Sequence, residues 1–371
     1  MGELILHIGT RKTGTTALQK FFVDNREALM RNGVDYTRFT PQKSDPYSYS
    51  INGVFLRQYC RALVLQKEID NLVSDFKENY ERLVVALKGD NRVLLSDENL
   101  SAFFNQKYES QYNPEKYWRE MARIVKELGA RQITIIVYLR RQDEYVVSSW
   151  KERVKGGWTD KPFREYLNDP DREYELNYKI LLDAIQSAFG SSAKIIVRSY
   201  NQVAYSGIDI FHDFCDSLGI AWDSDYIIPK RRLNEAISFD MAEALLKVKL
   251  GKPGRSRDEK RVRKNLAVAL CRNQPDPKGT TIFLPGEAES LMKQYSDGNR
   301  RISEVYFDNK NLFSEEYNEG PNWHPNKFRI TWYRIVLTVI SILSQMSLKA
   351  NNGFRVAGMF IKRLRKKRDA Y

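Results

Sequence analysis

The feature that most constrains the fold of this chain is its first apolar segment and the glycine-containing turn behind it. Residues 3–22 read Glu-Leu-Ile-Leu-His-Ile-Gly-Thr-Arg-Lys-Thr-Gly-Thr-Thr-Ala-Leu-Gln-Lys-Phe-Phe. The short apolar run predicts a strand, Gly9 and Gly14 bracket a turn, and later apolar residues recur at helical spacing. The sequence therefore predicts a strand, a glycine loop and a helix that continues to Arg31, with Gly33 as its C-terminal cap.

A loop of this kind suits an anion. The first N–H groups of a helix lack partners within the helix, and the helix dipole adds partial positive charge there. Gly14 lets the backbone approach an anion closely, and Thr15 and Thr16 add hydroxyl donors in the first helical turn. We expect the loop to hold a phosphate or sulfate group.

The position of the lysine indicates which anion binds. In a nucleoside-triphosphate P-loop, lysine directly follows the second glycine, and the hydroxyl residue after it holds magnesium. Here Thr15 stands in that lysine position, and Lys12 lies two residues before Gly14. The order Lys-x-Gly-Thr-Thr resembles the 5′-phosphosulfate-binding loop of sulfotransferases that use 3′-phosphoadenosine 5′-phosphosulfate (PAPS).

This resemblance implies that Lys12 contacts the phosphosulfate and takes part in catalysis. It also implies that PAPS is the co-substrate, that 3′-phosphoadenosine 5′-phosphate (PAP) is a product, and that no metal is needed. The donor-binding residues implied for the loop are Gly9, Thr10, Arg11, Lys12, Thr13, Gly14, Thr15 and Thr16.

A second motif follows a later strand. Residues 131–139 form an apolar, β-rich run, typical of a strand covered on both faces of a parallel sheet. Arg140 and Arg141 come next, and Ser148 lies eight residues after Arg140. This spacing resembles the sulfotransferase motif in which an arginine and a serine hold the 3′-phosphate of the donor, which implies that role for Arg140 and Ser148. Whether Arg140 or Arg141 is the main contact stays open, and Gln142 replaces a proline that is common in the family.

An acidic pair, Asp97 and Glu98, follows the strand predicted over residues 92–96. Ligands bind at the carboxyl ends of strands in an open parallel sheet, so the pair should share an edge with the glycine loop. A carboxylate there can take the proton of an acceptor hydroxyl. The Ser-Asp-Glu sequence resembles a segment of bacterial carbohydrate sulfotransferases, which implies Glu98, or failing that Asp97, as the base. Two other interpretations stay open: the pair caps the following segment, or it ends a Walker B strand and coordinates magnesium.

Strands alternate with helical patterns along most of the chain. Two helices, or one long bent helix, are predicted over residues 54–88. The predicted strands after the first cover residues 34–37, 92–96, 131–139 and 194–200. This alternation predicts an α/β fold with three layers, P-loop-like, in which helices flank a mainly parallel central sheet. We expect a sulfotransferase domain over residues 1–313 and a helical, basic C-terminal extension over residues 314–371.

The positive charge of the chain is unevenly distributed. The net charge is +13, of which residues 325–371 contribute +10 and residues 247–272 contribute +8, so the remainder carries −5. A nucleic-acid binder is expected to carry a basic face on its folded domain. The distribution therefore argues against nucleic acid as a partner.

The sequence of the C-terminal segment predicts a helix followed by a basic tail that acts as a peripheral membrane anchor. Arg334 interrupts an apolar stretch over residues 330–348, and its unbroken part, residues 335–343, is too short to span about 30 Å of hydrocarbon. Residues 354–368 join an apolar patch to six basic side chains, which suits an anionic membrane surface. The alternative is a helix packed on the enzyme with a basic tail behind it.

The sequence predicts a cytoplasmic location, because its three cysteines are too few and too scattered for a disulfide framework and its first apolar run is too short for a signal peptide. The basic C-terminal tail adds a peripheral position at the inner face of the cytoplasmic membrane. The sequence as a whole predicts a sulfotransferase that moves a sulfonyl group from PAPS to a hydroxyl of a carbohydrate acceptor, a polysaccharide or a lipid-linked sugar. Two alternatives remain: a P-loop phosphotransferase that uses ATP and magnesium, and a non-enzymatic, membrane-associated polyanion binder.

Overall fold

The computed structural model describes residues 2–36, 51–65, 70–89, 92–101, 113–229, 236–248, 257–272, 274–314 and 320–349. Contacts divide the chain into two compact units, each assembled from three segments. The first unit comprises residues 1–145, 170–234 and 289–316, and the second comprises residues 146–169, 235–288 and 317–371. The expected division into residues 1–313 and 314–371 stays a prediction.

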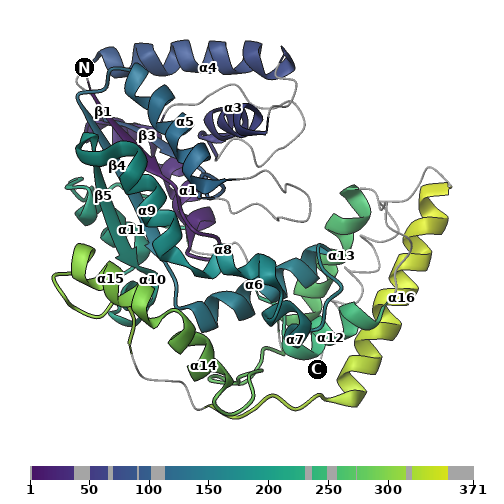
Figure 1. Cartoon of the computed structure of the whole chain (residues 1–371). Helices are drawn as coiled ribbons and strands as arrows, with labels where there is room; N and C mark the ends of the chain where they lie inside the picture. Colours follow the sequence, from purple (N-terminus) through teal and green to yellow (C-terminus); the bar gives the residue numbers. More distant parts are fainter. Residues whose placement is uncertain are drawn as a thin grey trace. The chain divides into compact units, whose positions relative to one another are not determined.

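The first unit is built on a central sheet in which the described strands are all parallel (Figure 1). The strand order is β2–β3–β1–β4–β5. The strands are β1 (Glu3–His7), β2 (Val34–Asp35), β3 (Arg92–Ser96), β4 (Gln132–Leu139) and β5 (Ala193–Ser199). Because β3 and β4 flank β1, the loop that follows β1 lies in the middle of the carboxyl edge of the sheet.

Helices cover both faces of this sheet. Strand side chains alternate between the faces, so Leu4 and Leu6 lie in one core and Ile5 in the other. The first core packs under α3 (Val54–Val64), α4 (Asp70–Lys88), α5 (Pro114–Glu127), α9 (Tyr178–Phe189) and α15 (Ser296–Tyr306). The second packs under α1 (Thr15–Asp24), α2 (Arg26–Arg31), α10 (Tyr200–Tyr205) and α11 (Ile210–Ser217). This arrangement confirms the predicted three-layer α/β fold with a parallel sheet.

The helix after the glycine loop is broken, so the prediction that it continues to Arg31 is wrong. The break lies at Asn25, between α1 and α2. Asn25 Nδ2 donates to the carbonyls of Phe21 at 2.9 Å and Ile227 at 3.0 Å, and Asn25 Oδ1 accepts from Ile227 N at 2.6 Å. A segment two hundred residues away thus holds the side chain that interrupts the helix.

The second unit consists mainly of helices. They are α6 (Gln142–Gly156) from Val146 onward, α7 (Phe163–Leu167), α12 (Phe239–Lys247), α13 (Arg257–Cys271), the start of α14 (Glu287–Gln294), and α16 (Lys327–Lys349). Both α12 and α13 pack against α16. Within the part of the chain that the structure describes, no helix combines the length and the apolar character needed to cross a membrane.

A buried carboxylate on α12 fixes the beginning of α16. Asp240 is 4% exposed, and its Oδ1 accepts hydrogen bonds from Trp323 Nε1 and Asn326 N, both at 3.1 Å. Its Oδ2 lies 3.4 Å from Arg329 Nη1. Asn326 in turn caps the helix, since its Oδ1 accepts from Arg329 N at 2.9 Å. Asp240 thereby joins the cap of α16 to α12.

Replacing Asp240 should weaken this attachment. Asp240→Ala leaves two donors without their acceptor, and we expect a loss of about 2 kcal/mol in the free energy of unfolding. Urea denaturation at neutral pH measures this value. Asp297→Ala is the matched control, because the Asp297 side chain is 92% exposed, and it should leave stability unchanged. Equal stability of Asp240→Ala and the wild type would contradict the assigned role.

Candidate functional site

The loop between β1 and α1 contains three residues with left-handed backbone. The φ angles are 39° at Gly9, 67° at Lys12 and 81° at Gly14. A β-carbon on Gly9 would lie 2.7 Å from Thr15 Oγ1, and one on Gly14 would lie 2.7 Å from Ile210 Cδ1. The left-handed backbone therefore favours glycine at both positions, and a β-carbon at either one would force a neighbouring side chain to move. Lys12 has a β-carbon and still adopts this conformation, so the loop holds it under backbone strain.

Hydrogen bonds join the glycine loop to the end of β4. Thr10 Oγ1 donates to Tyr138 O at 2.8 Å, and Thr13 Oγ1 donates to Thr10 O at 2.6 Å. Arg140 Nη1 donates to Lys12 O at 3.2 Å. The two sequence motifs, separated by more than a hundred residues, thus meet at the backbone of Lys12.

The first residue of α1 contributes an unpaired hydroxyl. Thr15 Oγ1 is buried and has no hydrogen-bond partner in the structure. Buried polar atoms are nearly always paired, and an unpaired one is explained most simply by a ligand or an ordered water. Since Thr15 begins the helix behind the glycine loop, its hydroxyl suits an oxyanion bound there.

The two arginines that follow β4 have different environments. Arg141 is 6% exposed, and its guanidinium donates to Asp143 at 2.8 Å and to Ser314 O at 3.0 Å. The Arg140 side chain is 21% exposed and pairs with Glu144 at 3.0 Å. Arg140 is therefore the arginine that reaches the glycine loop, whereas Arg141 is held by internal partners.

Ser148 lies on α6 and is half-buried. The boundary between the two units falls inside α6, after Tyr145, so Ser148 belongs to the second unit and its pairing with Arg140 stays a prediction. Trp150, two residues later, is fully buried, and its Nε1 donates to Lys161 O at 3.1 Å.

Gln142 stands where the resembled family often has a proline. Its side chain is buried, and its amide exchanges hydrogen bonds with the Asn299 amide at 2.8 and 3.2 Å. Asn299 lies on α15, so the substitution joins the beginning of α6 to a helix near the end of the first unit. A proline could not form this pair.

The acidic pair stands at the carboxyl end of β3, on the same sheet edge as the glycine loop. Asp97 is fully buried, its Oδ2 accepts from Arg57 Nε at 2.7 Å, and its Oδ1 accepts from Asn99 N at 2.8 Å. Burial alone would lower the pKa of Arg57, but the Asp97 carboxylate raises it above its usual value. The neighbouring Glu98 is half-buried.

Two side-chain contacts join the turn after β3 to the glycine loop. Arg11 donates to Asn99 Oδ1 from Nη2 at 2.9 Å and from Nε at 3.3 Å. Ser101 Oγ donates to Gly9 O and to Glu98 O, the latter at 3.1 Å. These contacts hold Glu98 beside the loop. The sequence did not predict these contacts, nor the contact of Arg57 with Asp97. In each case the two partners are far apart along the chain and form no motif.

A buried histidine lies at the end of β1. His7 Nδ1 is 2.9 Å from Ser96 Oγ, which also accepts from Gln19 Nε2 at 3.3 Å. His7 Nε2 has no hydrogen-bond partner. Desolvation lowers the pKa of His7 to about 3, so the ring is neutral at ordinary pH. Among the described residues, no group of three or more His, Cys, Asp or Glu side chains could hold a metal ion.

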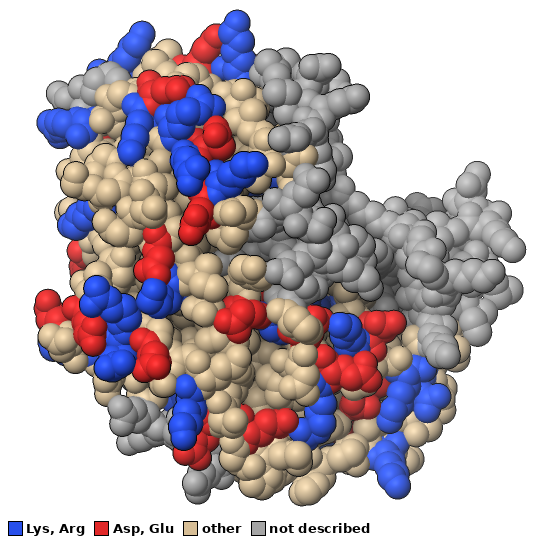
Figure 2. All heavy atoms as spheres, in the orientation of Figure 1, with Lys and Arg blue, Asp and Glu red and all other residues tan. Residues whose placement is uncertain are grey.

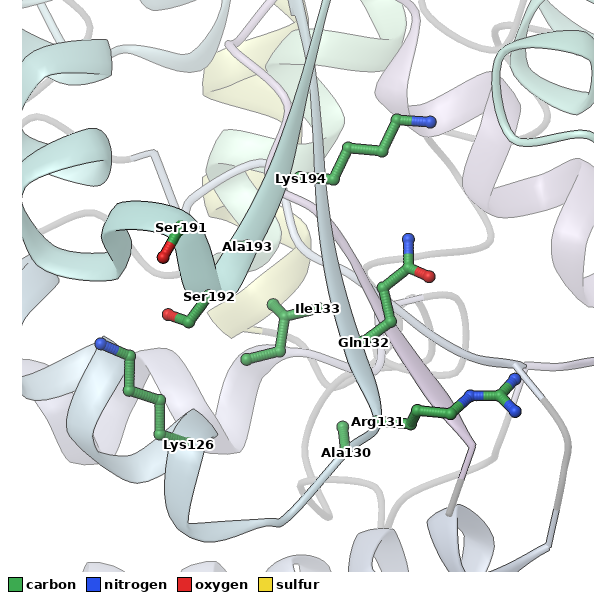
Figure 3. Close-up of a pocket in the computed structure, with 9 residues that line it drawn as sticks. All are labelled: Lys126, Ala130, Arg131, Gln132, Ile133, Ser191, Ser192, Ala193 and Lys194. Carbon is green, nitrogen blue, oxygen red and sulfur yellow. The ribbon is translucent and has the colours of Figure 1, made fainter.

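A separate pocket opens at the opposite, amino-terminal edge of β4 and β5 (Figure 3). Its volume is about 520 Å³. The lining includes three basic side chains, Lys126, Arg131 and Lys194, whose charged ends are spread apart rather than directed at one point. On the face drawn in Figure 2, Lys and Arg are interspersed with Asp and Glu. Neither this pocket nor the face drawn in Figure 2 gathers positive charge at one point, so neither is proposed as the anion site.

Comparison with known proteins gives limited similarity. No protein-family model matches the sequence. A curated relative from Archaeoglobus fulgidus, described as an uncharacterized protein, is 27% identical over 213 residues, which is 53% of this chain and 53% of that protein. The match thus spans about half the length of the relative. The crystal structure of a sulfotransferase from Alicyclobacillus acidocaldarius is similar with a TM-score of 0.36 and 16% identity, over 62% of this chain and 85% of that chain. At these values, an assignment of activity depends on the site residues.

The buried His7 predicts a pH dependence of stability. Its pKa is about 3 in the folded protein and about 6.5 in an unfolded chain, so the unfolded state binds the proton first as pH falls. The neutral His7 ring therefore makes its full contribution to the free energy of unfolding above pH 7. This contribution falls by about 2 kcal/mol between pH 7 and pH 5.

Urea denaturation of the wild type and of His7→Asn at both pH values measures this contribution. The variant should lose about 2 kcal/mol less than the wild type over that interval. His324→Asn, which changes an exposed histidine, is the matched control. The same pH dependence in the wild type and in His7→Asn would show that His7 takes up no proton on unfolding.

Proposed function

We propose that this protein is a PAPS-dependent sulfotransferase whose acceptor is a carbohydrate hydroxyl. The observation that carries the proposal is the hydrogen bond from Arg140 to the backbone of Lys12. The resemblance assigns these two cations to the two anionic groups of one donor molecule. Those groups sit on the same ribose, so the residues that bind them have to lie close together.

The chemistry of the loop suits the phosphosulfate. Lys12, the N-terminus of α1 and the Thr15 hydroxyl would bind the 5′-phosphosulfate, and Arg140 would exchange Glu144 for the 3′-phosphate. The acceptor oxygen attacks sulfur in line, and the bond between sulfur and the bridging phosphate oxygen breaks. PAP leaves with that electron pair, and Lys12 offsets the charge that grows on its phosphate.

The base in this proposal is Glu98. Asp97 has no exposed surface and is bonded to Arg57 and to the backbone of Asn99, so it has no access to an acceptor. We assign Asp97 a positioning role, in which it shapes the turn that carries Glu98. Glu98 would accept the proton of the attacking hydroxyl and become a carboxylic acid. It would release that proton to water before the next turnover.

The two alternatives have less support. A magnesium-dependent phosphotransferase needs a lysine where Thr15 stands, and it needs Asp97 to leave Arg57 for the metal. A non-enzymatic polyanion binder would depend on the two basic segments and would need neither the strained Lys12 nor the contact between Lys12 and Arg140.

The donor site can be tested without knowing the acceptor. Titration calorimetry should show that PAP binds with a micromolar Kd in the absence of metal. Lys12→Ala and Arg140→Ala should each weaken binding by about tenfold to a hundredfold, because each removes a charge-assisted contact to phosphate.

Arg123→Ala is the matched control for this titration, since Arg123 is an exposed arginine of α5 whose side chain is 51% accessible. It should bind PAP like the wild type. Binding of magnesium-ATP and not of PAP would instead establish the phosphotransferase, and binding of neither would refute both nucleotide sites.

The role of Glu98 can be separated from donor binding. Glu98→Gln keeps the size of the side chain and removes its basicity, so we expect kcat to fall by about a hundredfold or more while PAP affinity stays within about twofold. The assay follows PAP release from PAPS with a panel of polysaccharide and glycolipid acceptors. Glu127→Gln, on the exposed surface of α5, is the matched control. Full activity of Glu98→Gln would exclude Glu98 as the base.

A further inference from the structure

The helix α16 carries apolar side chains on two opposite faces. One face packs in the second unit, where Ile330, Tyr333 and Leu337 are 4%, 0% and 2% exposed. The other face is open to solvent. Its apolar side chains are Phe328, 85% exposed, Trp332, 42%, Ile335, 58%, and Val339, 42%.

The exposed side chains form one continuous stripe, here called the α16 stripe (Phe328, Trp332, Ile335 and Val339). Their spacing of four, three and four residues places them within about 60° of one another around the helix axis. Single exposed apolar residues are common on protein surfaces and need no explanation. A run of four on one helix face, including a phenylalanine and a tryptophan, marks an interaction surface.

Basic side chains flank the α16 stripe. Lys327 and Arg334 are exposed, and their positions fall on the same flank of the helix, between the stripe and the buried face. The sequence of α16 contains no Asp or Glu, and the residues after it, 350–371, add seven Lys or Arg and one Asp. The stripe therefore lies in a segment with a large excess of positive charge.

The positive charge beside the α16 stripe favours one of two partners that could cover it, a second copy of the chain or an anionic membrane. A second copy of the chain packed antiparallel on the stripe would bring Lys327 and Arg334 to the same side as the equivalent cations of its partner. An anionic bilayer complements both features, because the acyl boundary accepts the apolar side chains while the headgroups accept the flanking cations. Tryptophan in particular favours the interface between hydrocarbon and water.

We propose that α16 binds the surface of an anionic membrane, lying in the interface with the α16 stripe facing the lipid. The buried face keeps α16 attached to the second unit through Ile330, Tyr333 and Leu337, so the helix does not need to leave the protein to bind. The proposal is independent of the proposed sulfotransferase activity.

The experiment is co-sedimentation of the full chain with vesicles. Vesicles of phosphatidylglycerol and phosphatidylcholine in equal parts should bind the protein, and pure phosphatidylcholine vesicles should bind it much less. The double variant Phe328→Ser with Trp332→Ser should lose about tenfold or more in the partition coefficient. The variant Lys327→Gln with Arg334→Gln should bind more weakly and lose part of its salt dependence.

Matched controls keep the test specific. Ile208→Ser with Val305→Ser removes two apolar side chains of similar exposure, 53% and 52%, from the first unit, and it should bind vesicles like the wild type. Thermal unfolding checks that every variant is folded.

Other outcomes would overturn the proposal. If the Phe328→Ser, Trp332→Ser variant binds anionic vesicles as strongly as the wild type, the α16 stripe does not contact the lipid. The binding site would then be the basic residues in 350–371. Absence of binding to anionic vesicles would refute a membrane surface. A concentration-dependent dimer that the same variant abolishes, seen by sedimentation velocity without lipid, would assign the stripe to a second copy.

Discussion

Because β1 hydrogen-bonds to β3 on one side and to β4 on the other, the carboxyl ends of three parallel strands meet at the glycine loop. That register places Lys12, the turn with Glu98, and Arg140 at one edge. The candidate site is thus a product of strand order, because Lys12, Glu98 and Arg140 lie in the segments that directly follow β1, β3 and β4. Changing the neighbours of β1 would separate these groups even if every motif stayed intact.

Charge pairing then distinguishes the groups that hold the site from those that can act in it. Arg57 with Asp97, and Arg141 with Asp143, are largely buried pairs whose members satisfy each other. Removing one member of such a pair leaves an uncompensated charge, so these residues serve as fixed supports. Arg140 with Glu144 is more accessible. A pair in contact with water contributes little to stability, so Arg140 is less firmly held than the two buried arginines.

The parts of this structure that depend on local pattern could be predicted from the sequence. The apolar runs gave β3 and β4 nearly to the residue, since strands buried on both faces have continuous apolar sequence. The break at Asn25, the pair of Gln142 with Asn299, and the contact of Arg11 with Asn99 could not be predicted. Each depends on two segments distant in sequence, and neither partner is unusual on its own. For the same reason, the sequence could not distinguish Asp97 from Glu98 as the candidate base. In the structure Asp97 is fully buried, whereas Glu98 is half-buried.

The alternation of the two units along the chain has a consequence for folding during translation. The chain passes from one unit to the other five times, at residues 145, 169, 234, 288 and 316. The core of the first unit includes Ile302, Leu312 and Phe313, so a ribosome has to synthesise most of the chain before that core can close. Two segments of the second unit, residues 146–169 and 235–288, are synthesised before the first unit is complete. The core on one face of the sheet is therefore completed only after α15 has been synthesised.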